Sequence, residues 1–185
     1  LEQLASQNTQ LESEVTVRRQ AEQALHRTQD DLEVLVAQRT AELARANESL
    51  QRAETYLAEA QRLSLTGSFG WKVANGEIYW SQETFRIFGT NPTVKPTVEL
   101  ILQQTHPEDR ATVRQIVDRA SRERKDFDFE HRLSMPDGSV KYVRVVGHPL
   151  IDKSGSFEFV GAVTDITERK QAEEEHQAHL WFLES

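Results

Sequence analysis

The side chains of this sequence best suited to chemistry near neutral pH are six histidines: His26, His106, His131, His148, His176 and His179. Imidazole can bind a metal ion or transfer a proton. These histidines do not have the spacing of metal ligands, and no nucleophile is paired with any of them. The sequence also lacks a glycine-rich phosphate loop. It therefore predicts no catalytic residue and no metal site.

Composition narrows the choice of partners. The 185 residues include no cysteine, which excludes disulfides, thiolate nucleophiles and flavin photochemistry that needs a cysteinyl adduct. The formal net charge is −8, and nucleic acids and anionic membranes are bound mainly through Lys and Arg, so neither is expected as a partner. No apolar run approaches the roughly 20 residues of a membrane span, and no signal-peptide pattern is seen. We expect a cytoplasmic fragment of a longer protein.

The turn-forming residues divide the chain into three parts. All eight glycines and all five prolines lie between Gly67 and Gly161. Residues 1–66 hold a single aromatic side chain, Tyr56, and so cannot build a broad core. Gly67 is expected to close the first helix near Leu65. The predicted parts are a helix over 1–63, a compact domain over 64–166 and an outgoing linker helix over 167–185.

The first part has the heptad pattern of a coiled coil. From Leu4 to Ala60, alternating steps of four and three residues meet mainly apolar side chains, separated by Glu, Gln, Arg and Asp. A lone helix cannot bury one narrow apolar stripe, so the sequence predicts a parallel homodimer. The seam residues expected at its interface are Leu25, Leu32, Val36, Leu43, Leu50 and Leu57.

Polar residues interrupt this seam, among them Arg18, Glu22, Gln29 and Arg39. Polar groups on a coiled-coil axis set register or oligomeric state at a cost in stability. The other interpretation is that the first half of the helix is frayed. Either way, we expect the dimer to be tightest from Leu32 to Leu57.

The middle part alternates between polar and apolar residues in short runs, as strands do. Asn75-Gly76 is a favoured hairpin turn. Between the second and third runs, Ser81 can cap a short helix, and Pro107 suits the first position of a longer one. The expected strands are Ser68–Val73, Glu77–Trp80, Phe127–Leu133, Val140–Val146 and Phe157–Val163. The expected helices span 82–88, Val98–Gln104 and a longer stretch that opens at His106-Pro107.

Two strands, several helices and three more strands define an α+β fold. Hairpin-length connections make the sheet antiparallel, and the intervening helices can cover only one of its faces. We therefore expect a five-stranded antiparallel sheet with helices on one face, preceded by the long coiled-coil helix and followed by a C-terminal helix.

Several motifs of this region resemble, in the right order, those of PAS domains of the common bacterial sensor type. They are Gly67-Ser68-Phe69-Gly70-Trp71, Trp80–Glu83, Ile87–Gly89, His106–Arg110, Phe129–Leu133, Pro136–Ser139 and Gly161–Lys170. The resemblance covers about residues 64–170. The preceding stretch, Leu32–Leu50, resembles the helical linkers before PAS domains in sensor histidine kinases.

The resemblance implies a sensory and dimerisation module of a bacterial multidomain signalling protein, in the first place a sensor histidine kinase. Its partners would be a second copy and neighbouring domains of the same chain. There are two alternatives. One is a structural dimerisation spacer without ligand, and the other is a regulatory segment of a cyclic-dinucleotide synthase or phosphodiesterase. The phosphoacceptor motif of histidine kinases would place an acid directly after the histidine and a proline a few residues later. Leu180-Trp181-Phe182 follow His179 instead, so phosphotransfer at His176 or His179 is not expected.

A small ligand could occupy the space between sheet and helices, although the same side chains could form a plain core. The inward-facing candidates are Phe69, Trp71, Phe85, Phe88, Ile101, Ile116, Phe129, Val145 and Val163. The cofactor, if any, is left open. Some PAS domains bind haem through a histidine on the long helix, but His106 lies at the cap of that helix, so haem is not expected. His131 and His148 are expected to be exposed or hydrogen-bonded.

The last strand leads directly into the outgoing helix. Asp165 can cap this helix, and Glu168 can return a bond to the cap. By the resemblance, Asp165, Ile166 and Thr167 also transmit signals between sheet and helix, and capping without a switching role is the alternative. A second seam in steps of three and four continues through Ile166, Arg169, Ala172, His176, His179 and Leu183.

Overall fold

The computed structural model describes the backbone of residues 2–151, 155 and 157–184, and the side chains of residues 6–151, 155, 157–177 and 179. The chain divides into two compact units, Leu1–Glu54 and Thr55–Ser185, and the division falls inside the first helix.

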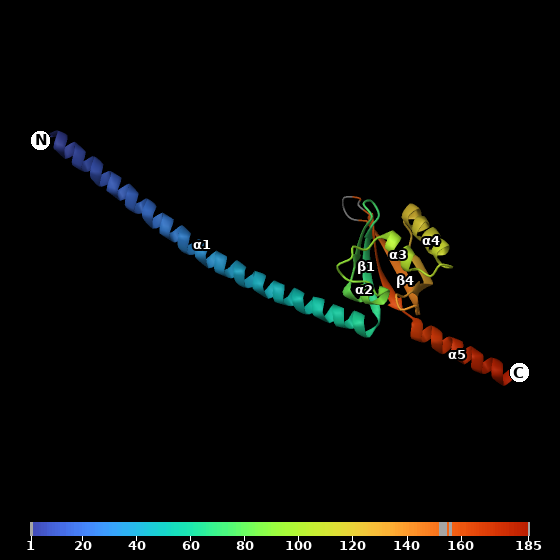
Figure 1. The fold of residues 1–185 in the computed structure, drawn as a ribbon. Coiled ribbons are helices and arrows are strands. Elements are labelled where there is room, and N and C mark those ends of the chain that lie inside the picture. Colours follow the sequence, from blue (N-terminus) through green and yellow to red (C-terminus); the bar gives the residue numbers. More distant parts are fainter. Residues whose placement is uncertain (1, 152–154, 156, 185) are drawn as a thin grey trace. The chain divides into compact units, whose positions relative to one another are not determined.

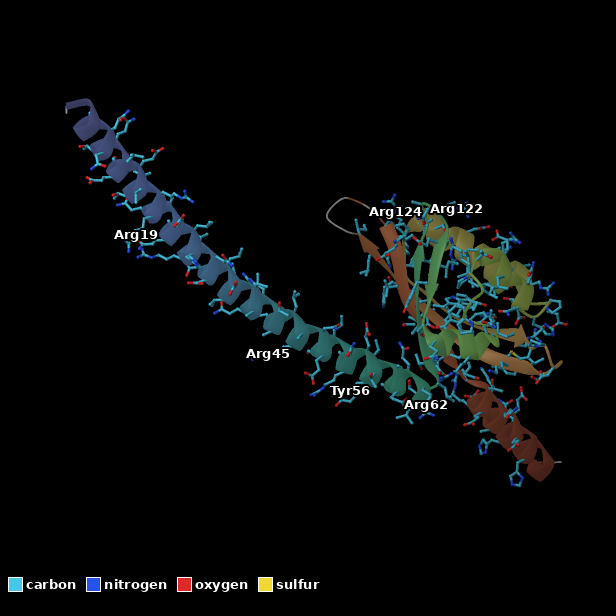
Figure 2. The ribbon with its side chains drawn as sticks, turned by 60° about the vertical axis from the view of Figure 1, so that its left-hand side comes forward. Arg19, Arg45, Tyr56, Arg62, Arg122 and Arg124 are labelled. Atoms are coloured by element: carbon cyan, nitrogen blue, oxygen red, sulfur yellow. The ribbon has the colours of Figure 1, made fainter. Side chains whose placement is uncertain are left out.

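The first helix, α1, runs without interruption over Glu2–Leu63. It contains neither glycine nor proline, and ion pairs such as Arg18–Glu22 and Arg52–Glu48 link successive turns. The seam residues within this helix are exposed, and Leu43 keeps 71% of its surface accessible. Figure 2 shows side chains such as Arg19 and Arg45 projecting from the helix. The seam position Leu4 lies outside the described side chains.

The residue expected to terminate α1, Gly67, does not do so. The helix ends at Leu63, and Leu65, not a glycine, adopts the left-handed conformation with φ 51°. Gly67 instead lies in the first strand, where a Cβ atom would collide with the backbone nitrogen and Oγ1 of Thr84. Gly67 therefore serves close packing against α2 (Gln82–Phe88), not helix termination.

The second unit contains the predicted five-stranded antiparallel sheet, with strand order β2-β1-β5-β4-β3. The strands are β1 (Thr66–Lys72), β2 (Glu77–Trp80), β3 (Phe127–Ser134), β4 (Val140–Ile151) and β5 (Phe157–Asp165). The helices α2, α3 (Val98–Gln104) and α4 (Arg110–Glu123) cover one face (Figure 1). The predicted α+β class is confirmed.

Strand β4 continues five residues beyond its predicted end at Val146. Gly147 and Pro149 lie in this extension, and proline cannot donate a hydrogen bond to a neighbouring strand. Strand β3 pairs with β4 only as far as Gly147, whereas β5 pairs with it through Ile151. Pro149 therefore lies where β4 no longer pairs with β3. No hydrogen bond to β3 is lost through the missing N–H of the proline.

Helix α4 begins at Arg110, three residues later than Pro107. The backbone carbonyl of His106 accepts a hydrogen bond from the Asp109 N–H at 2.9 Å, so residues 106–109 form a turn. The Asp109 side chain makes no capping bond, because it is held by Arg132 of β3. A tertiary ion pair therefore holds the side chain of Asp109, the residue at the N-cap position of α4.

The core lies between the sheet and these helices. Its centre is Phe159 on β5, which is fully buried and packs against Trp71, Phe127 and Phe157 with ring centroids 5.0–5.6 Å apart. Two residues further, a Cβ atom at Gly161 would meet the carbonyl oxygen of Val146. The last strand is therefore pressed closely against both its neighbours and the core. The final helix, α5 (Thr167–Glu184), follows β5.

Candidate functional site

A cavity of about 70 Å³ lies between the covered face of the sheet and the helices. Eight of the nine predicted inward-facing residues line it, and the ninth, Phe85, packs edge-on against Trp80 at 5.2 Å instead. The sequence prediction missed other lining residues, among them Ile78, Leu102 and His131. The inward positions of the strands follow the period-two alternation, which explains why most of the wall was predictable.

His131 is the main correction to the sequence interpretation. It was expected to be exposed or hydrogen-bonded, but it is 6% exposed and lines the cavity. Neither ring nitrogen has a hydrogen-bond partner in the described part of the chain. The alternation of β3 carried the signal, because Phe127, Phe129, His131 and Leu133 all have the same parity and point to the same face.

Burial lowers the pKa of His131 to about 4, although the nearby Asp109 carboxylate raises it. The desolvation of the charged imidazolium outweighs this attraction. Asp109 is committed elsewhere, because it accepts bonds from the backbone N–H and the guanidinium of Arg132 at 2.6–3.0 Å. His131 is therefore neutral at pH 7, with one nitrogen that donates and one that accepts.

We expect the free energy of unfolding to fall by up to about 3 kcal/mol as the pH drops from 6.5 to 4. The unfolded chain protonates His131 near pH 6.5, whereas the folded domain does so only near pH 4. Between these values the unfolded state binds more protons, so acid favours unfolding. Urea unfolding at several pH values would measure the slope.

The variant His131→Leu should lose this slope, while His148→Gln, at an exposed histidine, should keep it. Hydrogen bonds from Arg132 lower the pKa of Asp109 from its ordinary value of 3.8. The stability that Asp109 contributes is therefore lost only as the pH falls below 3.8, outside the range of this measurement. Equal slopes in wild-type protein and His131→Leu would contradict the assignment.

The junction between β5 and α5 is tied to β4. The Asp165 carboxylate accepts bonds from the N–H and the hydroxyl of Thr167 at 3.0 and 2.6 Å. Thr167 Oγ1 in turn accepts the N–H of Tyr142, and the Ile166 N–H donates to the Tyr142 carbonyl at 2.9 Å. The three residues predicted to link sheet and helix therefore lie in one hydrogen-bonded group.

The capping pattern at this junction differs from the prediction. The Ile166 carbonyl accepts the N–H of Lys170, so the first helical bond starts at Ile166 and not at Asp165. Asp165 is the last residue of β5, and its carboxylate binds two residues ahead, at Thr167. Asp165 therefore holds the turn into the helix through Thr167. The expected capping box would instead have paired Asp165 with Glu168.

The residues that follow α1 are bonded to the residues that precede α5. The Asp165 N–H donates to the carbonyl of Leu65 at 2.9 Å, and the hydroxyls of Thr66 and Thr164 lie 3.0 Å apart. Gln61, in the last turn of α1, also reaches Ser68 of β1. Incoming and outgoing segments thus meet at one point, which we call the Leu65–Asp165 junction.

Salt bridges also hold the first turns of α5. Glu130 on β3 pairs with Arg169 at 2.6 Å and with Lys170 at 2.8 Å, and these cations lower its pKa. Glu130 adjoins His131 in sequence and lies on the opposite face of the strand. Strand β3 therefore contributes both a side chain of the cavity wall and an ion-pair partner of α5. Arg169, predicted as a seam residue, makes this contact, whereas the seam position Leu183 lies outside the described side chains.

The other histidines are not among the residues that line the cavity. His176 and His179 are exposed on α5. Among the described residues, no three His, Asp or Glu side chains are placed to hold a metal ion. No described helix combines the length and apolarity needed to cross a bilayer.

A five-stranded antiparallel sheet that encloses an apolar cavity under short helices, and whose last strand leads into a C-terminal helix, is the architecture of a PAS domain. The family model PAS_3, described as PAS fold, matches residues 43–163. The chain belongs to this family.

Relatives in two signalling classes are similar to the chain. The blue-light-activated histidine kinase of Brucella anthropi is 33% identical over 144 residues, which is 72% of this chain and 29% of that protein. The probable diguanylate cyclase DgcE of Escherichia coli is 25% identical over 134 residues, 72% of this chain and 12% of that protein. The chain thus spans under a third of the length of either relative.

Solved structures agree on the fold. A sensory box histidine kinase/response regulator from Burkholderia thailandensis has a TM-score of 0.53 at 24% identity, covering 68% of this chain and 95% of the other. The N-terminal domain of a diguanylate cyclase from Marinobacter aquaeolei has a TM-score of 0.52 at 21% identity, covering 57% and 98%. At these identities the similarity shows a shared PAS fold.

Proposed function

We propose that this chain is a cytoplasmic sensory and dimerisation module of a bacterial sensor histidine kinase, which relays signals between its PAS core and paired flanking helices. The observation that carries the proposal is the Leu65–Asp165 junction, where the incoming and outgoing segments share a hydrogen bond. The similarity to the Brucella histidine kinase supports the choice of output.

The relay would work through small shifts at this junction. Displacement of the end of β5 moves Asp165, and with it both the Leu65 carbonyl and the start of α5. Each hydrogen bond contributes about 1 kcal/mol, and coupling between sites is typically about 1–3 kcal/mol. A few bonds of this kind are therefore enough to bias two packings of the paired helices.

The exposed seam of α1 supports the paired state. Leu32, Leu43 and Leu50 are exposed along the helix, and this apolar stripe has no partner in its own unit. A second copy in parallel would bury it, layer against layer. The signal would then travel as a change in how the two helices pack.

A cyclic-dinucleotide output is the second candidate, and the similarity to DgcE and to the Marinobacter domain favours it. The same relay would serve either output. The light activation named for the Brucella protein is not carried over, because the chain has no cysteine for a flavin adduct. A pure spacer is disfavoured, because its core would not need a cavity lined by an unpaired histidine.

Asp165→Ala tests the relay. The change removes the acceptor for the N–H and hydroxyl of Thr167 and the ionic contact with Lys141 at 3.7 Å. The amides of residues 167–170 should then exchange with deuterium roughly tenfold faster, since about 1 kcal/mol or more of local stability is lost. In the intact parent protein, the output should lose its regulation.

Asp128→Ala is the matched control, because it breaks an exposed pair with Arg144 on the same sheet and leaves α5 untouched. Its exchange at residues 167–170 should equal that of wild-type protein. Unaltered exchange and normal regulation in Asp165→Ala would remove the relay role of the junction.

A further inference from the structure

We propose that His131 is the polar anchor of a binding site for a small neutral molecule with an apolar body of a few heavy atoms and one hydroxyl or similar group. The molecule would occupy the cavity beneath the helices. This inference rests on the proposed sensory function and deepens it by naming the class of molecule that the domain senses.

The unpaired imidazole is the first argument. His131 is more than nine-tenths buried, and neither nitrogen has a partner among the described side chains and backbone groups. Buried polar atoms in folded proteins are almost always satisfied by protein, water or ligand. The carboxylate of Asp109, which raises the pKa of His131, is already bound by Arg132. The neighbouring Phe129 ring stacks on the imidazole without accepting a hydrogen bond from it. The missing partner must therefore come from the cavity.

The size of the cavity is the second argument. Its volume of about 70 Å³ is roughly half that of an engineered apolar cavity that accepts benzene, and well above the requirement of one water molecule. An apolar wall holds water poorly, so a ligand with an apolar body suits it better than a water cluster. About three or four heavy atoms would fit. Haem and flavin are many times larger.

The chemistry of the wall decides the charge of the ligand. None of the lining residues is Asp, Glu, Lys or Arg. An ion would lose its hydration without meeting a counter-charge. A neutral imidazole offers one donor and one acceptor, which matches a hydroxyl group that also donates and accepts.

A second buried polar atom without a partner among the described residues, Trp71 Nε1, also lines the cavity. An indole N–H can only donate a hydrogen bond, whereas the neutral imidazole of His131 offers one donor and one acceptor. His131 is therefore the better match for a hydroxyl group that both donates and accepts.

Titration of the full chain with 1-propanol, followed by the ¹⁵N shifts of the His131 ring, tests the site. We expect saturable binding, with a dissociation constant on the order of 1 mM for so small a ligand, and shifts of both ring nitrogens. Xenon serves as the apolar probe, because it fills apolar cavities without hydrogen bonding.

The variant His131→Leu removes the anchor and keeps a side chain of similar size. It should bind 1-propanol at least fivefold more weakly and xenon within twofold of wild-type protein, while His131→Gln should regain part of the propanol affinity. Equal propanol affinity in His131→Leu would overturn the proposal. So would the absence of saturable propanol binding in wild-type protein that binds xenon, since water alone would then satisfy His131.

Should the variants not fold, the ¹⁵N shifts of wild-type protein decide, because propanol binding without a change at His131 contradicts the anchor. Failure of the site and failure of the relay remain distinct. Propanol binding that leaves the exchange of residues 167–170 unaltered would contradict only the relay. Loss of regulation in Asp165→Ala, together with no saturable propanol binding by wild-type protein, would contradict only the site.

Discussion

Replacing Leu43 by aspartate is expected to raise the dissociation constant of the proposed dimer at least 100-fold. In a parallel coiled coil the two Leu43 side chains share one layer, so the substitution removes two buried leucines and places two carboxylates side by side. Each leucine contributes about 1.5–3 kcal/mol, and every 1.4 kcal/mol is a factor of ten in affinity. Sedimentation equilibrium of the whole chain measures the change.

Ala41→Asp is the matched control for this prediction. Ala41 lies on the helix face away from the seam, so an aspartate there should leave the dimer mass unchanged. A dimeric Leu43→Asp protein, or a monomeric wild-type chain, would contradict the pairing.

The direction of the pair can be read from Leu50→Cys. The natural sequence has no cysteine, so this side chain would be the single thiol. A disulfide needs Cα atoms about 5.5–6 Å apart, a distance that the parallel register provides between equivalent residues. Rapid oxidation to a covalent dimer is expected, whereas its absence in a chain that still dimerises would indicate antiparallel helices.

Phe159→Ala is expected to lower the free energy of unfolding of the PAS domain by about 3–5 kcal/mol. The Phe159 ring is 0% exposed and contacts three other aromatic rings, so its loss leaves a cavity that rigid strands cannot close. A domain of this size has about 5–15 kcal/mol of stability in total, so the variant should be largely destabilised. Urea unfolding followed by tryptophan fluorescence measures the difference.

Tyr79→Ala is the control, because Tyr79 lies on a strand of the same sheet but is 67% exposed. It should cost less than about 1 kcal/mol. A loss in Phe159→Ala no larger than this would show that Phe159 is not the centre of the core.

The cavity and the junction together indicate how occupancy could reach the flanking helices. His131 and Glu130 are adjacent residues of β3, one facing the cavity and the other paired with Arg169 and Lys170. A ligand that shifts β3 would therefore act on α5 through a contact one residue away. The Leu65–Asp165 bond extends the same shift to the incoming segment.

The sequence predicted much of this domain because its signals are local. Asn75-Gly76 and the flanking alternation located the first hairpin, and Ser81 and Gly89 located the ends of α2 as observed. Period-two alternation likewise placed Phe129, Val145 and Val163 in the cavity wall. These features depend on neighbours a few residues away, and the sequence shows such neighbours directly.

The sequence by itself determined the order of helices and strands, the heptad seam and most of the apolar wall, because periodicity and turn residues act over short stretches of chain. Only the tertiary structure decided that Asp109 binds Arg132 instead of capping α4, that His131 is buried without a partner, and that Asp165 meets Leu65. Each of these contacts depends on which distant segment packs against the residue. Asp109 and Arg132, for example, are 23 residues apart in the sequence. Desolvation and long-range pairing arise only when strands and helices pack together, so no local pattern could have shown them.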